Sequence, residues 1–220
     1  SKTINSGQTC IAPDYVLVSN NLKEELMFHI NEEWNKMYGG SILSSDKYPK
    51  IIHKGHYDRI IGLIDPKKVK YGGDKNDDTL QISPTILDGV TLDDPVMKEE
   101  IFGPILPVIG VDSLQEAIDI IHEFEKPLAL YYYGNSKGAE NVLKKTSSGG
   151  ACINDAMMHI ANTNLPFGGV GQSGYGAYHG YDSFLCFTHK KGVVTTPTWI
   201  DLPFKYVPFK GFKWLKKFLT

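Results

Sequence analysis

The chain has 220 residues, of which 41% are hydrophobic and 22% charged, and its formal net charge is -2. This composition is typical of a soluble globular domain and excludes an intrinsically disordered chain. The near-neutral charge and a single arginine, Arg59, argue against a nucleic-acid reader, since phosphate recognition usually relies on arginine. The cysteines Cys10, Cys152 and Cys186 are odd in number and widely spaced, which argues against a disulfide framework and for a cytoplasmic location. No apolar run reaches the roughly 20 residues of a membrane span.

The first half of the chain is predicted to alternate strands with helices. Asp14 to Ser19 reads as a strand, and Asn21 to Met37 reads as an amphipathic helix. Asn21 and Glu24 have the spacing of a capping box at its start. The inner face of this helix is expected to carry four apolar side chains, Leu22, Leu26, Ile30 and Trp34. Further elements are expected in this order: a helix from Tyr48 to Ile64, then short strands at Val69 to Tyr71 and Gln81 to Leu87.

Beyond residue 104 the alternation becomes regular and the strands become fully apolar. Ser113 and Glu116 form a capping box for one of the helices. The expected strands are Ile105 to Val111, Leu128 to Tyr133 and Gly150 to Ile153, and the expected helices end at His122 and cover Lys137 to Lys145. Alternating apolar strands and helices predict βαβ units. The fold class is therefore α/β, with a parallel, doubly wound sheet flanked by helices.

The last part of the chain has a different character. Residues 162–180 are glycine-rich, and Phe184 to Thr188 and Val193 to Thr196 read as late strands of an oligomerisation type. We therefore expect an α/β domain over residues 1–182, followed by C-terminal strands and a basic, aromatic tail over residues 183–220. Phe212, Leu215 and Leu219 could share one face of a helix lying on a membrane surface. Docking of the tail on the parent enzyme or on a second subunit is the alternative.

Cys10 directly follows a short glycine turn, Asn5-Ser6-Gly7-Gln8-Thr9. A cysteine nucleophile needs access to its thiolate form and donors for the oxyanion that it creates. A tight turn can aim the Cys10 backbone N–H into the space where that oxyanion forms. The pattern alone is weak because most cysteines are structural. A buried, inert Cys10 therefore remains the alternative at this point.

Five blocks of sequence together resemble class 3 aldehyde dehydrogenases, the fatty and aromatic aldehyde type. The blocks keep the order of that family: residues 5–18 (NSGQTCIAPDYVLV), 95–107 (PVMKEEIFGPILP), 125–131 (EKPLALY), 146–150 (TSSGG) and 165–180 (LPFGGVGQSGYGAYHG). The resemblance implies the catalytic domain of an enzyme that uses NAD or NADP, and a homodimer. It also implies that Cys10 attacks an aldehyde, that the thiohemiacetal loses hydride to become a thioester, and that a glutamate-activated water releases the acid.

The resemblance also implies roles for other residues. Glu100 matches the glutamate that bonds the nicotinamide ribose, and Phe102 matches an aromatic residue near the nicotinamide. The aldehyde pocket is expected to use Met157, Ile160 and Phe167. His159 and His179 are expected to be structural, since the mechanism takes its base from a glutamate.

Two further patterns are rejected as sites. Residues 169–174 spell GxGxxG, but neither a preceding strand nor a following helix is predicted. His53 and His56 form HxxH without further ligand residues, so no metal site is expected.

The resemblance places the general base and most of the dinucleotide sheet upstream of Cys10, which only nine residues precede. An isolated chain is therefore expected to be inactive as a dehydrogenase. Three rival functions remain: an acylating aldehyde or acyl-phosphate reductase, a hydrolase that pairs Cys10 with a histidine, and a non-catalytic assembly fragment.

Overall fold

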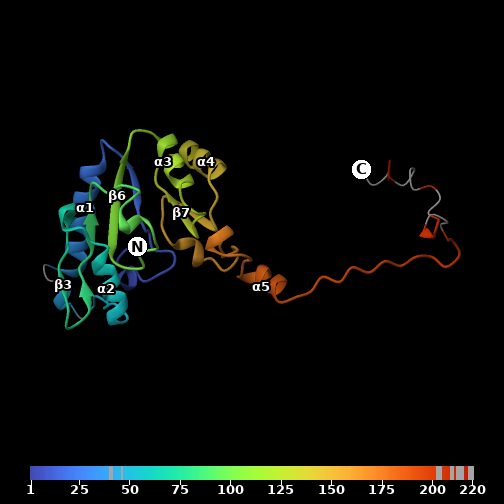
Figure 1. Cartoon of the computed structure of the whole chain (residues 1–220), viewed down its shortest axis with the longest axis horizontal. Helices are drawn as coiled ribbons and strands as arrows, with labels where there is room; N and C mark the ends of the chain where they lie inside the picture. The colour runs from blue at the N-terminus through green and yellow to red at the C-terminus, as the bar shows by residue number, and fades with distance from the viewer. Residues whose placement is uncertain (40–41, 46, 202–204, 209–210, 212–215, 218–220) are drawn as a thin grey trace. The chain divides into compact units, whose positions relative to one another are not determined.

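The computed structural model describes residues 1–39, 42–45, 47–201, 205–208, 211 and 216–217 of the chain. These form two compact units, Ser1–Phe187 and Thr188–Thr220 (Figure 1). Within the described residues, no helix is long and apolar enough to cross a bilayer. The expected helical face of Phe212, Leu215 and Leu219 lies outside the described residues.

The larger sheet of the first unit has four strands in the order β1-β6-β5-β2. Its strands are β1 (Val16–Ser19), β6 (Ile105–Val111), β5 (Thr85–Leu87) and β2 (Val69–Tyr71). Strand β6 is parallel to both β1 and β5, with Val16 opposite Val108 and Thr85 opposite Ile105. Strand β2 is the antiparallel edge. The parallel-dominated α/β sheet predicted from the apolar strands is confirmed.

A second, two-stranded sheet pairs β7 (Ala129–Tyr132) with β8 (Gly150–Ile153) in parallel, and α4 (Ser136–Lys145) connects them. Helix α3 (Leu114–His122) leads from β6 to β7, as predicted. Ser113 caps α3 by accepting the N–H of Glu116, and Asn135 caps α4 by accepting that of Gly138. Helix α3 thus joins these two sheets, and a third sheet pairs the short strands at residues 75–76 and 81–82 in antiparallel.

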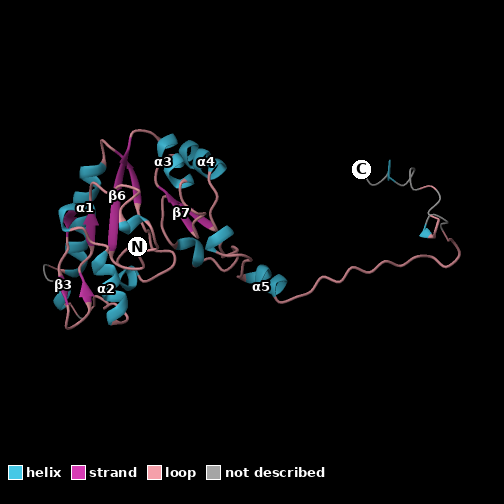
Figure 2. Ribbon diagram, in the orientation of Figure 1, coloured by secondary structure: helices cyan, strands magenta, loops and turns pink. Residues whose placement is uncertain are grey.

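Helices α1 (Lys23–Tyr38) and α2 (Lys54–Gly62) flank the larger sheet (Figure 2). Helix α1 buries Met27 and Trp34 against β5 and β6, and α2 buries Tyr57 and Ile60 in the main hydrophobic core. The smaller elements are β3 (Lys75–Asn76), β4 (Gln81–Ile82), α5 (Gly180–Cys186) and the 3-10 helices η1 (Ile4–Gly7), η2 (Ile42–Ser44), η3 (Pro66–Lys68), η4 (Pro95–Met97), η5 (Met158–Ile160) and η6 (Gly171–Ser173).

Three predicted boundaries in the first half are wrong for local reasons. Helix α1 starts after Leu22 without a side-chain cap, because Asn21 instead accepts a hydrogen bond from Ser19, and Leu22 points to solvent. Helix α2 starts six residues later than predicted, because the Tyr48 side chain is buried and hydrogen-bonds Ile82. The single strand predicted over Gln81 to Leu87 is divided into β4 and β5 at Pro84, which has no N–H to donate.

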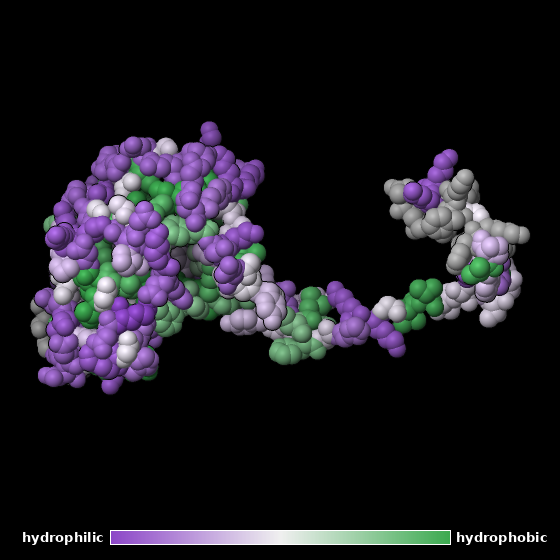
Figure 3. All heavy atoms as spheres, viewed as in Figure 1, coloured by the Kyte–Doolittle hydropathy of each residue, from purple (hydrophilic) through white to green (hydrophobic). Residues whose placement is uncertain are grey.

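The prediction of two late strands, over Phe184 to Thr188 and Val193 to Thr196, is also wrong. Helix α5 occupies most of the segment from Phe184 to Thr188, and Val193 to Thr196 are in neither helix nor strand. A strand needs a neighbouring strand to satisfy its backbone, whereas Val193 and Val194 are exposed. Figure 3 shows such hydrophobic (green) side chains at the surface of the second unit. Cys186, which lies within the strand predicted over Phe184 to Thr188, is exposed at the end of α5.

Candidate active site

The turn before Cys10 has an unusual left-handed backbone. Asn5, Ser6 and Gly7 have φ values of 49, 51 and 73 degrees, a region that residues with a side chain seldom adopt. Hydrogen bonds stabilise this left-handed backbone. The Ser6 hydroxyl donates to the carbonyl of Pro49, and the Gln8 side-chain amide donates to the carbonyls of Asn5 and Lys50. The turn presents Cys10 as an exposed free thiol, so Cys10 is not buried.

Gly7 brings this turn into backbone contact with a second turn, residues 100–103. A Cβ atom at Gly7 would lie 2.2 Å from the carbonyl oxygen of Gly103. Only glycine permits so close an approach with a positive φ. The turn that carries Cys10 and the turn that carries Glu100 and Phe102 are therefore neighbours, as the resemblance implied.

Helix α2 holds the second turn through its backbone carbonyls. The Arg59 guanidinium donates to the carbonyls of Glu100, at 3.2 Å, and Ile101, at 2.5 Å. The His56 ring hydrogen-bonds the Phe102 carbonyl through Nε2 at 2.8 Å. These bonds stabilise Phe102 at a φ of 48 degrees, which is strained for an aromatic residue. Sequence reasoning missed this role of Arg59, although it is the only arginine of the chain.

The buried Lys2 and the half-buried Asp14 form an ion pair beside the second turn. Asp14 accepts the N–H of Ile101 at 3.2 Å, and its carboxylate lies 3.8 Å from the Lys2 ammonium. Lys2 is only 4% exposed, and its Nζ has no hydrogen-bond partner among the described residues. Burial lowers the pKa of Lys2 to about 8, against the opposing effect of Asp14 and Glu100. Burial also raises the pKa of Asp14, and partial desolvation together with the Asp14 charge raises the pKa of the exposed Glu100.

The three predicted pocket residues follow strand β8 in the chain. Met157 and Ile160 are half-buried, and Phe167 is buried. The Ile160 N–H donates to the Met157 carbonyl at 3.2 Å. Phe167 packs on the ring of His159, with ring centroids 5.6 Å apart. On strand β7, the Tyr131 hydroxyl donates to the carbonyl of Ile11, next to Cys10.

The closest thiol–imidazole contact involves a different cysteine. Cys152 Sγ lies 3.4 Å from His159 Nδ1, and both side chains are buried. Burial lowers the pKa of His159, which favours its neutral form. Within the described part of the chain, no hydrogen bond connects Cys10 to a histidine. The structure therefore gives no support to a hydrolase built on Cys10 and histidine.

The second turn suits a nicotinamide cofactor. The Glu100 side chain is exposed, so its carboxylate can accept hydrogen bonds from ribose hydroxyls. The half-exposed Phe102 ring provides an apolar face beside it. Within the residues that the structure describes, no group of three potential ligand side chains could hold a metal ion.

The fold and the two adjoining turns define an α/β domain that presents an exposed cysteine beside an acidic, aromatic turn. Residues 1–193 match the aldehyde dehydrogenase family, and the chain belongs to that family. It is 43% identical to 4,4'-diaponeurosporen-aldehyde dehydrogenase of Staphylococcus aureus over 99% of this chain and 48% of that protein. It is 44% identical to a bovine dimeric, NADP-preferring aldehyde dehydrogenase over 89% of this chain and 82% of that sequence.

Solved structures agree with these sequence matches. The substrate-bound state of Staphylococcus aureus AldH superposes with a TM-score of 0.86 at 42% identity, covering 100% of this chain and 49% of that one. A betaine aldehyde dehydrogenase from the same organism, in complex with NAD+ and with a BME-modified cysteine, gives a TM-score of 0.78 at 26% identity, covering 92% of this chain and 43% of that one. The chain thus spans about half the length of these two enzymes.

Proposed function

We propose that the chain is the nucleophile-bearing half of a class 3 aldehyde dehydrogenase that oxidises aldehydes to carboxylic acids with NAD or NADP. The observation that carries the proposal is the backbone contact between Gly7 and Gly103. That contact sets an exposed cysteine against the turn of Glu100 and Phe102. Family membership and relatives described as NADP-preferring or complexed with NAD+ support the class of reaction and of cofactor.

In the proposed reaction, the Cys10 thiolate bonds to the aldehyde carbon, and the Cys10 backbone N–H donates to the oxygen that becomes negative. The nicotinamide cofactor, when bound, accepts the hydride that leaves this carbon. Glu100 would hold the ribose by accepting its hydroxyl protons, while Phe102 packs beside the ring. Cys10 then carries a thioester, which water hydrolyses. We assign the base that activates this water, and most of the dinucleotide site, to the other half of the enzyme, so the 220-residue chain alone should not be an active dehydrogenase.

Met157, Ile160 and Phe167 are proposed to line the aldehyde path, since apolar and adaptable side chains suit varied aldehydes. A homodimer is proposed because a relative is described as dimeric. The three free cysteines support a reducing, cytoplasmic location. An acylating relative, with the same thioester on Cys10, is the second candidate for the reaction.

The test is competition among the three cysteines for limiting iodoacetamide, followed by mass mapping. Cys10 should be labelled first. Cys152 is buried, and the exposed Cys186 thiol donates a hydrogen bond to the Ala177 carbonyl at 2.9 Å that alkylation must break. Adding urea provides the control, because all three thiols should then react alike. Preferential labelling of Cys152 or Cys186 in the folded chain would contradict the assignment of Cys10.

A further inference from the structure

Tyr131, on strand β7, reaches the segment that carries the nucleophile from 120 positions along the chain. We propose that Tyr131 is a positioning residue, whose hydroxyl fixes the turn that contains Cys10 relative to strand β7. This inference rests on the function proposed for Cys10 and extends it to a residue that does not itself touch the reacting atoms.

The hydrogen bond to the Cys10 segment is short and partly sheltered. The Tyr131 hydroxyl donates to the Ile11 carbonyl at 2.7 Å. Ile11 lies inside the turn that the Ala12 N–H closes by donating to the Thr9 carbonyl at 2.9 Å. Tyr131 therefore restrains the downstream end of the turn that contains Cys10, while the Gly7 contact restrains the upstream end. A turn held at both ends fixes the direction of the Cys10 N–H, on which oxyanion stabilisation depends.

The protonation state of the Tyr131 hydroxyl suits this role. Burial raises the pKa of Tyr131 well above its ordinary value. The hydroxyl consequently stays protonated at physiological pH and remains a donor to the Ile11 carbonyl.

The Tyr131 ring is itself well restrained. Tyr131 pairs with Cys152 in the parallel register of β7 and β8, and its ring lies 6.0 Å from that of His159. His159 is fixed in turn by its contact with Cys152 and by Gly150, where a Cβ atom would lie 2.7 Å from the imidazole. Strand pairing and packing thus set the position of the phenol before it bonds Ile11. This gives the buried Cys152–His159 pair a supporting role that needs no chemistry of its own.

The test compares two reactions of Cys10 in the purified chain. In the first, the thiolate attacks p-nitrophenyl acetate, expels p-nitrophenolate with its electron pair, and becomes an acetyl thioester. This step creates an oxyanion, whereas alkylation by iodoacetamide does not. In Tyr131→Phe, which removes only the hydroxyl, acylation of Cys10 should fall about 10-fold, because misplacing reacting groups by about 1 Å can cost up to ~100-fold. Alkylation should change less than about 2-fold, since it does not need a positioned N–H.

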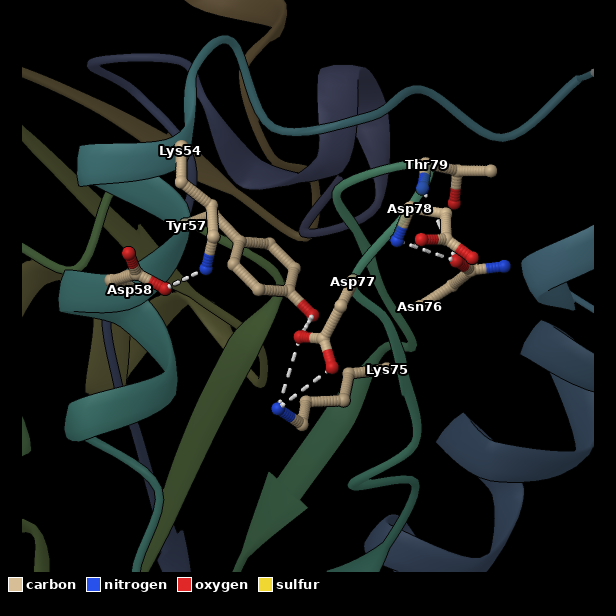
Figure 4. Close-up of polar contacts among 8 residues, drawn as sticks. All are labelled: Lys54, Tyr57, Asp58, Lys75, Asn76, Asp77, Asp78 and Thr79. Carbon is tan, nitrogen blue, oxygen red and sulfur yellow. Dashed lines mark hydrogen bonds and ion pairs between the residues drawn. The ribbon is translucent and has the colours of Figure 1, made fainter.

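Tyr57→Phe is the matched control. The Tyr57 hydroxyl donates to Asp77 at 2.9 Å at another part of the domain, and Figure 4 shows this contact beside Lys75. This control should lower the melting temperature and leave the ratio of acylation to alkylation unchanged. An unchanged ratio in Tyr131→Phe, or an equal change in Tyr57→Phe, would overturn the proposal. A wild-type Cys10 that is not acylated at all would overturn the proposed function as well.

A measurement on the wild type keeps the proposal testable if Tyr131→Phe fails to fold. The Ala12 amide should be protected in hydrogen exchange, because its bond to the Thr9 carbonyl closes the turn that Tyr131 holds through Ile11. Exchange of the Ala12 amide as fast as that of an exposed loop would contradict the positioning role.

Discussion

Replacing Gly7 by alanine perturbs the contact on which the proposed site depends. The new methyl group would lie 2.2 Å from the Gly103 oxygen, 2.6 Å from the Gly103 carbonyl carbon and 3.2 Å from the Lys2 oxygen. All three are backbone atoms, so no flexible side chain can move aside. The two turns must separate, or Gly7 must leave its φ of 73 degrees.

The cost has two parts. A left-handed conformation costs a residue with a side chain about 1–2 kcal/mol, and forcing an extra methyl group into packed surroundings costs about 1–3 kcal/mol. The sum, about 2–5 kcal/mol, corresponds to a fall in melting temperature of roughly 4–20 °C for a domain of this size. Gly89→Ala is the matched control, since Gly89 has a φ of 66 degrees and nothing within 4 Å of its Cβ position. Gly89→Ala should show only the cost of the left-handed conformation, about 1–2 kcal/mol.

Calorimetry or thermal circular dichroism measures the difference between these two variants. Acylation by p-nitrophenyl acetate then shows whether Cys10 is affected. We expect Gly7→Ala to lose more stability than Gly89→Ala by about 1–3 kcal/mol, and to slow the acylation of Cys10 while Gly89→Ala does not. Equal losses in the two variants, with normal Cys10 reactivity in both, would refute the role of the Gly7–Gly103 contact.

Two further predictions concern ionisable groups. A buried lysine whose folded pKa is lowered to about 8 from 10.5 costs stability below pH 8, and that cost disappears as the pH rises toward 10.5. In urea titrations, the unfolding free energy of the natural chain should therefore rise between pH 8 and pH 10.5, and that of Lys2→Met should not. Parallel curves of unfolding free energy against pH would contradict this. In an enzyme with both halves, Glu100→Gln should weaken cofactor binding or slow hydride transfer and leave the melting temperature nearly unchanged, because the Glu100 side chain is exposed. A large loss of stability with normal cofactor kinetics would show that Glu100 is structural.

Elements with a strong local signal were predictable from the sequence. Strands β6 and β8 have the predicted bounds, since each is a short apolar run flanked by turn or capping residues. The predicted N-cap at Ser113 is also confirmed, because its hydroxyl accepts the Glu116 N–H, although the Glu116 carboxylate accepts the N–H of Asp112 and not that of Ser113. The late strands failed because a strand depends on its neighbour, which local sequence does not reveal. The same limit explains why α2 begins late, since its start depends on the distant contact between Tyr48 and Ile82.

In the candidate site too, the sequence predicted some residues and missed others. Cys10, Glu100 and Phe102 could be identified because they lie within recognisable sequence blocks. The residues that bring them together could not, because they act on distant backbone atoms: Arg59 on the carbonyls of Glu100 and Ile101, Asp14 on the N–H of Ile101, and Tyr131 on the carbonyl of Ile11. A side chain that bonds a backbone group leaves no pattern at the residue it contacts.

Cys10 is exposed, yet the backbone that carries it is restrained on both sides. A nucleophile must be open to its substrate, yet its N–H must point in a fixed direction before the oxyanion forms. Exposed turns are normally among the more mobile parts of a protein. Here the exposed thiol is carried by a backbone whose upstream side is fixed by the steric contact of Gly7 and whose downstream side is bonded to Tyr131. Because one restraint is steric and the other a hydrogen bond, Gly7→Ala and Tyr131→Phe should act on Cys10 separately, and their combination should exceed either alone. Equal effects of the double variant and the stronger single variant would mean that both restraints act on one shared movement of the turn.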